Sequence, residues 1–399
     1  MRHQQRYMPV LWWKKGEQDA VKHLFTHDKL KMTPLLNVLG QGTHEEKGIR
    51  ESKRQRPKSD WLTEMADTIE KSWGYAPALV EVHALGGQPI PAGPLHPVVR
   101  LFDEARARGL RLVPVGRLTY RPVLRAAIWE TVVRDGRGMC IRLTRRDLAR
   151  PALQADLQNL LDDLALTPAE ADLVLDFEIV DASGFDLMVA CALLPILDEW
   201  RSFTVVGGAF PKDLGGPLQT PGRHLQSRYE WRTWTDQIGR SLPRTPAYGD
   251  YAMRYPLLIK YERRPTPSAS IRYTVDRDWV VMRGQQLNAE RFVQYRANAQ
   301  LLKAGTDYKG ESFSYGDQCI HEIATGTKNT GNPQSWLTVG VNHHLTLAVL
   351  QLASLFDSSS GHAHMTVADP AAPLPQAGRT TLPSAFQLSH ARDQAALTT

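Results

Sequence analysis

The chain has 399 residues, of which 42% are hydrophobic and 23% charged, and its net charge is +6. This composition is typical of a globular protein, and the absence of about 18 uninterrupted apolar residues excludes a membrane span and a membrane partner. The first 15 residues lack the apolar region of a secretory signal, so we expect the protein in the cytoplasm. The three cysteines are too widely spaced to predict a zinc cluster.

The first half of the chain alternates short apolar strands with helical segments. Strands are predicted at residues 8–13, 34–39, 78–83 and 111–115. Helices are predicted at residues 17–25, 61–73, 96–108 and 120–133. Ser59 or Asp60 can cap the second of these helices, and Gly109 ends the third.

The same alternation continues up to about residue 256. Further strands are predicted at residues 139–144, 172–178, 203–207 and 248–252, with helices at 153–164, 185–200 and 225–238. The last of the eight strands is the weakest prediction because Gly249 and Asp250 have low strand propensity.

Eight strand signals in about 250 residues predict a (β/α)8 TIM-type barrel over residues 1–256. The continuous apolar strands also agree with this fold, because a parallel sheet is buried on both faces. A doubly wound open sheet is the alternative. The count of eight strands and the length favour the barrel.

The pattern changes after residue 256. Residues 269–274 and 278–282 alternate like a hairpin, and residues 289–303 and 344–356 are helical in character. We therefore predict a small C-terminal α+β appendage over residues 257–356, packed on the barrel. Residues 357–399 are rich in Ser, Ala, Pro and Gly, which predicts a disordered tail.

Catalytic groups of such barrels lie at the carboxyl ends of the strands. The catalytic candidates at these ends are Lys15, His83, Asp176, Glu178 and Asp250. Strand alternation places Asp176 and Glu178 on one face, where two carboxylates could bind a cation or divide acid and base roles. The alternative is a structural layer in which the carboxylates pair with Arg142 and Lys14.

A second set of residues is predicted to bind a ligand. They are Lys14, Arg142, Gly207, Tyr251, Asp317 and His343. The adjacent His343 and His344 point about 100° apart on a helix, so they are poor joint ligands for one metal. No motif identifies a cofactor, and metal binding stays open.

Several ordered sequence blocks resemble the phage Beta protein family. They are Tyr7-Met-Pro-Val-Leu-Trp-Trp-Lys-Lys-Gly-Glu17, Pro34-Leu-Leu-Asn37, Tyr248-Gly-Asp-Tyr251, Arg272-Tyr-Thr274, Arg283-Gly284, Phe313-Ser-Tyr-Gly-Asp317 and Trp336 through Asn342-His-His344. Together they span residues 7–356. Asn37 departs from the family, which usually has an acidic residue there, so a role that needs a carboxylate at this position is in doubt.

The resemblance implies a prophage or satellite-phage gene of the gop-beta type of anti-phage module, in which Beta restrains a neighbouring toxin protein. Two other functions compete with this one. The charged residues at the strand ends would suit a hydrolase of an anionic small molecule, phosphorylated or nucleotide-like. The positive charge and the basic residues 47–58 would suit nucleic-acid binding, although acidic residues at 45, 46 and 51 make a solvated loop the simpler interpretation.

Overall fold

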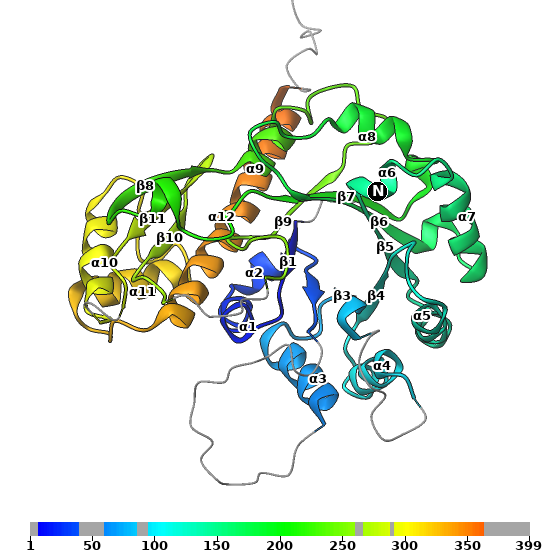
Figure 1. The fold of residues 1–399 in the computed structure, drawn as a ribbon, viewed down its shortest axis with the longest axis horizontal. Coiled ribbons are helices and arrows are strands. Elements are labelled where there is room, and N and C mark those ends of the chain that lie inside the picture. Colours follow the sequence, from blue (N-terminus) through cyan, green and yellow to red (C-terminus); the bar gives the residue numbers. More distant parts are fainter. Residues whose placement is uncertain (1–6, 40–59, 86–94, 260–265, 288–290, 363–399) are drawn as a thin grey trace, which may run out of the picture. The chain divides into compact units, whose positions relative to one another are not determined.

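The computed structural model describes residues 7–39, 60–85, 95–259, 266–287 and 291–362 (Figure 1). Eight parallel strands close into a barrel in the order β1-β2-β3-β4-β5-β6-β7-β9. The strands are β1 (Met8–Leu11), β2 (Leu35–Asn37), β3 (Ala78–Glu81), β4 (Leu112–Gly116), β5 (Met139–Thr144), β6 (Ala171–Ile179), β7 (Ser202–Gly208) and β9 (Ala247–Asp250). The predicted TIM-type fold is confirmed.

Helices follow the barrel strands and cover the outside of the barrel (Figure 1). They are α1 (Lys15–Lys22), α2 (Thr26–Lys29), α3 (Trp61–Ser72), α4 (Pro97–Ala107), α5 (Pro122–Asp135), α6 (Arg145–Leu148), α7 (Leu153–Asp163), α8 (Leu187–Leu193) and α9 (Tyr229–Thr235). Short 3-10 turns are η1 (His83–Leu85), η2 (Pro168–Glu170), η3 (Leu197–Glu199) and η4 (Gly216–Leu218). Asp60 caps α3 by accepting a hydrogen bond from the Leu62 N–H at 3.2 Å, which confirms one of the two predicted caps.

The closing strand β9 depends on a glycine. A Cβ atom on Gly249 would lie 2.7 Å from Cγ2 of Val206 and 2.8 Å from the Met8 carbonyl oxygen. These atoms belong to the two strands that flank β9, so only glycine allows them to approach this closely. The residue that weakened the strand prediction is therefore the one that lets the barrel close.

Two of the predicted barrel helices are much shorter in the structure. The predicted helix 185–200 ends at Leu193, because Pro195 lacks the N–H that would continue it and Ile196 has a φ of +46°. The predicted helix 225–238 begins only at Tyr229 and ends at Thr235. The residues before it form a strand, β8 (Gly222–Ser227), which pairs antiparallel with β11 (Asp278–Arg283).

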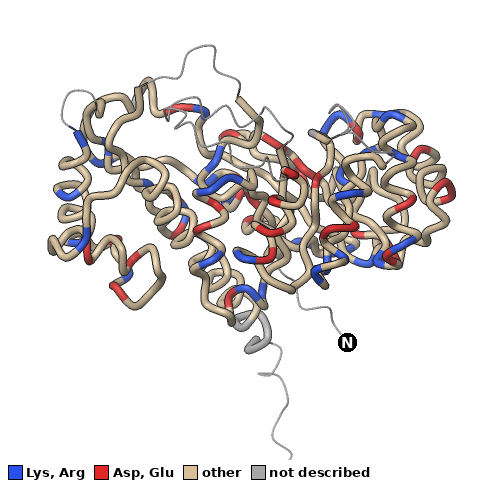
Figure 2. Tube along the Cα trace, turned by 90° about the horizontal axis from the view of Figure 1, so that it is seen from below, with Lys and Arg blue, Asp and Glu red and all other residues tan. Residues whose placement is uncertain are grey.

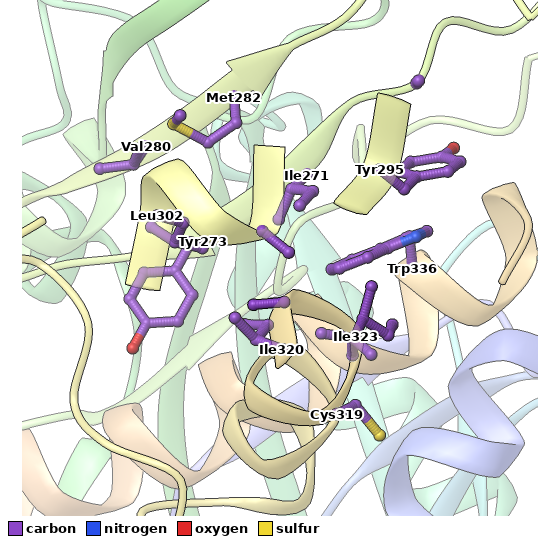
Figure 3. Packing of buried hydrophobic residues seen from close by; sticks show 14 residues of the cluster. Ile271, Tyr273, Val280, Met282, Tyr295, Leu302, Cys319, Ile320, Ile323 and Trp336 are labelled. Carbon is purple, nitrogen blue, oxygen red and sulfur yellow. The ribbon is translucent and has the colours of Figure 1, made fainter. Parts of the chain in front are cut away.

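Strands β8 and β11 belong to a separate three-stranded sheet, in the order β10-β11-β8, with β10 spanning Ile271–Thr274. One face packs against α10 (Gln294–Ala304), α11 (Tyr315–Thr325) and the start of α12 (Pro333–His362). The apolar side chains of this layer include Ile271, Tyr273, Tyr295, Ile320, Ile323 and Trp336 (Figure 3). On the other face, Trp279 and Val281 pack on residues that follow β7 and β9, including Phe210 and Met253.

Helix α12 lies between the barrel and the three-stranded sheet (Figure 1). Asn342 donates to the Ala20 carbonyl at 3.0 Å, and Thr338 donates to the Gly16 carbonyl at 3.0 Å, so the helix is bound to α1. Residues 333–356 are long and apolar enough to cross a bilayer, but 67% of their apolar window is buried inside the protein. Such burial is what a core helix of a soluble protein shows.

The chain up to Ser354 forms one compact unit, and a second unit starts at Leu355. The proposed tail lies outside the described residues from residue 363 onward. The division of the chain at residue 256 stays a proposal, since the appendage sheet also takes β8 from before that point.

Candidate functional site

Arg142 lies inside the barrel, where strand alternation directs its side chain from β5. Its Nε and Nη2 atoms donate to Oδ2 of Asp176 at 3.0 and 2.6 Å. Its Nη1 atom donates to Oδ1 of Asn37 at 3.0 Å and to Oε2 of Glu81 at 3.2 Å. One guanidinium therefore joins four barrel strands.

Tyr251, directly after β9, closes this cluster. Its hydroxyl donates to Oδ2 of Asp176 at 2.5 Å and accepts from Arg142 at 2.6 Å. Burial, together with Asp176, raises the pKa of Tyr251 well above its usual value. Burial alone would lower the pKa of Arg142, but Tyr251, Asp176 and Glu81 raise it. We call Asn37, Glu81, Arg142, Asp176 and Tyr251 the inner polar layer.

Glu81 connects the inner polar layer to the barrel mouth. Arg117 donates to its Oε2 atom at 2.9 Å, and the Tyr120 hydroxyl donates to Oε1. Burial would raise the pKa of Glu81, but Arg117 and Arg142 hold it below its usual value. The layer thus agrees with the predicted structural alternative in pairing carboxylates with Arg142, and Arg117 adds a second cation at Glu81.

Glu178 does not continue the alternation of β6. The strand register shifts between Asp176 and Ile179, and Glu178 has a φ of +55°. Its backbone N–H donates to Oδ1 of Asp176 at 2.8 Å, and its side chain is half-buried. Burial and Asp176 raise the pKa of Glu178, while Arg117 and Arg142 act in the opposite direction. The strand alternation on which the pairing of Asp176 and Glu178 was predicted is therefore interrupted at Glu178, whose carboxyl group still experiences the charge of Asp176.

The two remaining basic catalytic candidates lie outside the inner polar layer. His83 is exposed in η1, where its ring stacks on Tyr120 with centroids 5.6 Å apart. The side chain of Lys15 is 64% exposed and pairs with Asp19 one helical turn later at 2.5 Å. Both side chains are exposed, whereas Asp176 and Asp250 are buried, so the structure does not bring these five candidates together in one site.

Asp250 points away from the inner polar layer, opposite to its neighbour Tyr251. Its carboxylate accepts hydrogen bonds from Tyr7 at 2.5 Å, Tyr248 at 2.9 Å and His344 Nε2 at 3.0 Å. Burial would raise the pKa of Asp250, but His344 and Arg228 hold it below its usual value. Burial also lowers the pKa of His344, so we attribute the effect of this histidine to its hydrogen bond rather than to a charged ring. Asp250 therefore connects the closing strand to α12, which is a structural role.

Asp317 and His343 form a second buried polar cluster, within the appendage. Asp317 accepts hydrogen bonds from Tyr273 at 2.7 Å and Ser314 at 2.6 Å, and its Oδ2 atom lies 2.8 Å from His343 Nδ1. His343 Nε2 lies 2.8 Å from the Thr274 carbonyl oxygen. Both side chains are fully buried, so these two ligand-binding candidates contact each other and the surrounding protein.

A buried arginine and glutamate, absent from the sequence predictions, lie beside Asp250. Arg228 Nη2 is 4.0 Å from Asp250, and Arg228 Nε is 3.8 Å from Glu230. Among the residues described, neither carboxylate oxygen of Glu230 has a hydrogen bond of good geometry, and the backbone N–H groups of Glu230 and Ala209 give it only weak support. Burial raises the pKa of Glu230 to about 8, despite the opposing effect of Arg228. Burial therefore favours the neutral form of Glu230 well above the pH at which an ordinary glutamate ionises.

A pocket of about 200 Å³ opens at the carboxyl ends of β1, β7 and β9. Among the residues described, its lining includes four cationic side chains and no acidic one. The cationic residues are Lys14, Lys212, Arg254 and Arg272. Lys14 is thus the one predicted ligand-binding residue that lines this pocket.

Gly207 does not contribute to the pocket. A Cβ atom at this position would lie 2.7 Å from Val180 Cγ2 and 3.3 Å from Glu230 Cβ, so the glycine permits close packing outside the barrel. Within the described ranges, no group of three or more His, Cys, Asp or Glu side chains could hold a metal ion.

The family model described as Beta protein matches residues 7–349. The chain belongs to the Beta protein family. Its sequence matches no curated protein. The resemblance that the ordered sequence blocks carried is confirmed over nearly the whole described chain.

Solved structures similar to this Beta-family protein are distant. A mutant tryptophan synthase α-subunit from Pyrococcus furiosus is 15% identical with a TM-score of 0.31, and the match covers 53% of this chain and 81% of that one. The carboxyl transferase domain of Rhizobium etli pyruvate carboxylase, with pyruvate and biocytin, is 10% identical with a TM-score of 0.34. That match covers 88% of this chain and 49% of the other.

Proposed function

We propose that this Beta-family protein is the toxin-restraining component of a cytoplasmic anti-phage module, carried by a prophage or satellite phage. Membership of the family over residues 7–349 supports this context. We further propose that restraint works by binding a neighbouring toxin protein. The observation that carries this second point is the closed inner polar layer, in which the strand-end carboxylates already bond to other side chains of the barrel.

The alternative hydrolase would need its acid and base in one accessible site. Asp176 and Asp250 are 0% and 1% exposed, and they accept hydrogen bonds in separate clusters on opposite sides of the barrel wall. A substrate would have to break buried ion pairs to reach either carboxylate. We therefore favour binding over catalysis by these residues.

Co-expression with the neighbouring toxin tests the proposal. Lys15→Ala, His83→Ala and Glu178→Gln change candidate residues that are exposed or half-buried, so the variants should fold. If restraint is binding, each variant should protect cells from the toxin as well as the wild type does. Arg142→Met is the destabilised control, because a lower folded fraction in the cell should weaken its protection.

Two results would contradict the proposal. Failure of the wild-type protein to protect cells from the toxin would remove the proposed partner. Loss of protection by Glu178→Gln, with circular dichroism and melting temperature unchanged, would indicate that the carboxylate acts chemically.

Nucleic-acid binding has no comparable support. The basic residues 47–58 lie outside the described residues. In the part of the chain that is described, Lys and Arg are interspersed with Asp and Glu (Figure 2), and many arginines pair with carboxylates. DNA or RNA binding that weakens steeply with salt would restore this alternative.

A further inference from the structure

The pocket at the ends of β1, β7 and β9 collects positive charge from distant parts of the sequence. Lys14 follows β1, Lys212 follows β7, Arg254 follows β9, and Arg272 comes from β10. Four cations around a small pocket favour an anion, and arginine and lysine are the residues that most often bind phosphate groups.

Two of these cations are positioned by other side chains. The Arg272 guanidinium lies over the Phe210 ring, 4.6 Å from its centroid, and donates to the Met253 carbonyl oxygen at 3.1 Å. Arg254 Nε lies 3.3 Å from Oε1 of the buried Glu17. Because these contacts fix the side chains before a ligand arrives, less conformational entropy is lost on binding.

The rest of the lining is aromatic and aliphatic. Trp12 and Tyr255 are half-buried, and the Trp12 indole donates to the Tyr255 carbonyl oxygen at 3.3 Å. Phe210 is 2% exposed and packs edge-on against Trp279. Such walls suit a planar ring, whereas inorganic phosphate alone would use only the charged side.

The place and size of the pocket narrow the ligand class. In TIM barrels, phosphate is often bound by the loops after the seventh and eighth strands, which here are β7 and β9. A volume of about 200 Å³ lies below the roughly 300–1,000 Å³ of most ligand sites, which favours a compact ligand over a dinucleotide.

We propose that this pocket binds a small phosphorylated compound with a planar ring, of the size of a nucleoside monophosphate. The four cations bind the phosphate, and Trp12 and Tyr255 contact the ring. This site is independent of toxin restraint and uses none of the residues of the inner polar layer.

Isothermal titration calorimetry on the full chain tests the site. The probes are AMP, GMP, CMP and UMP, with ribose 5-phosphate and adenosine as partial ligands. We expect at least one mononucleotide to bind with a Kd below about 1 mM, and more tightly than either partial ligand. Lys212→Glu should weaken that binding at least about tenfold, because the exposed Lys212 contributes charge without supporting the fold.

The matched control is Lys309→Glu, which changes the net charge equally. Lys309 is exposed, and its backbone N–H donates to the Tyr273 hydroxyl. Tyr273 lies on the face of β10 opposite to Arg272, so Lys309 is not on the side of the sheet that carries this pocket residue. This variant should bind as the wild type does. The proposal is overturned if no mononucleotide binds below about 1 mM, if Lys309→Glu weakens binding as much as Lys212→Glu, or if a partial ligand binds equally tightly.

Discussion

Replacing Arg142 by Met should strongly destabilise the barrel. The substitution keeps an unbranched side chain but removes the cation that bonds to Asp176 and Glu81 inside the barrel. Breaking a buried ion pair from one side costs about 3–5 kcal/mol, because the remaining charge stays buried without a partner. Total unfolding free energies are about 5–15 kcal/mol, so the loss should be a large fraction of the stability.

Urea denaturation followed by circular dichroism measures this loss. The control is Arg125→Met, which removes the ion pair between Arg125 and Asp163. Their side chains are 35% and 54% exposed, respectively. Exposed pairs contribute only about 0–1 kcal/mol, so the control should unfold near the wild-type midpoint. The double variant Arg142→Met, Asp176→Leu should recover part of the stability, since apolar replacement of a buried pair is often neutral. An Arg142→Met variant within about 1 kcal/mol of the wild type would refute this interpretation of the layer.

Two further substitutions test buried positions near the closing strand. The pKa of Glu230 is about 8 in the folded protein, whereas its ordinary value, expected in the unfolded chain, is 4.5. As pH rises, the unfolded chain therefore releases this proton at lower pH than the folded protein does, and the unfolding free energy falls between about pH 4.5 and 8. Glu230→Gln should remove the cost of ionising this buried group, so the variant should be more stable than the wild type by ~3–5 kcal/mol at pH 8 but not at pH 4.5. Urea denaturation at the two pH values measures the difference. A gain in stability that does not depend on pH would contradict the raised pKa of Glu230. Gly249→Ala should lower the unfolding free energy by about 1–3 kcal/mol, because the new Cβ atom would collide with Val206 and Met8. The control is Gly239→Ala, whose Cβ atom would have no neighbour within 4 Å, so its melting temperature should equal that of the wild type in thermal denaturation. Equal melting temperatures for the two alanine variants would show that β9 adjusts.

The barrel could be predicted because its strands carry local signals. All but the closing strand are short, mainly apolar runs buried on both faces, and such runs differ from helical segments in length and spacing. Strand β8 carries no such signal. Its residues are mainly polar, and all are exposed or half-buried, including Arg223, His224 and Gln226. It is a strand because it pairs with β11, more than fifty residues away.

Single candidate residues could be predicted at the strand ends, but their partners could not. The structural alternative paired the carboxylates of the sixth predicted strand with Arg142, and the contact between Asp176 and Arg142 agrees with it. The contact of Asp250 with His344 joins residues 94 positions apart, and no sequence spacing predicts it. The pocket cations Lys212, Arg254 and Arg272 were missed for the same reason, although position after a barrel strand was an available signal for the first two.

The closing strand couples two structural clusters that the sequence presented as one functional site. Adjacent residues of a strand point to opposite faces, so Tyr251 bonds to Arg142 inside the barrel while Asp250 bonds to His344 of α12 outside it. A change in either cluster therefore acts on the same strand and on the position of α12. Loss of function after substitution of Asp250 or Tyr251 is consequently expected from lower stability alone. Substitutions of accessible pocket residues such as Lys212 test ligand binding without this effect on the fold.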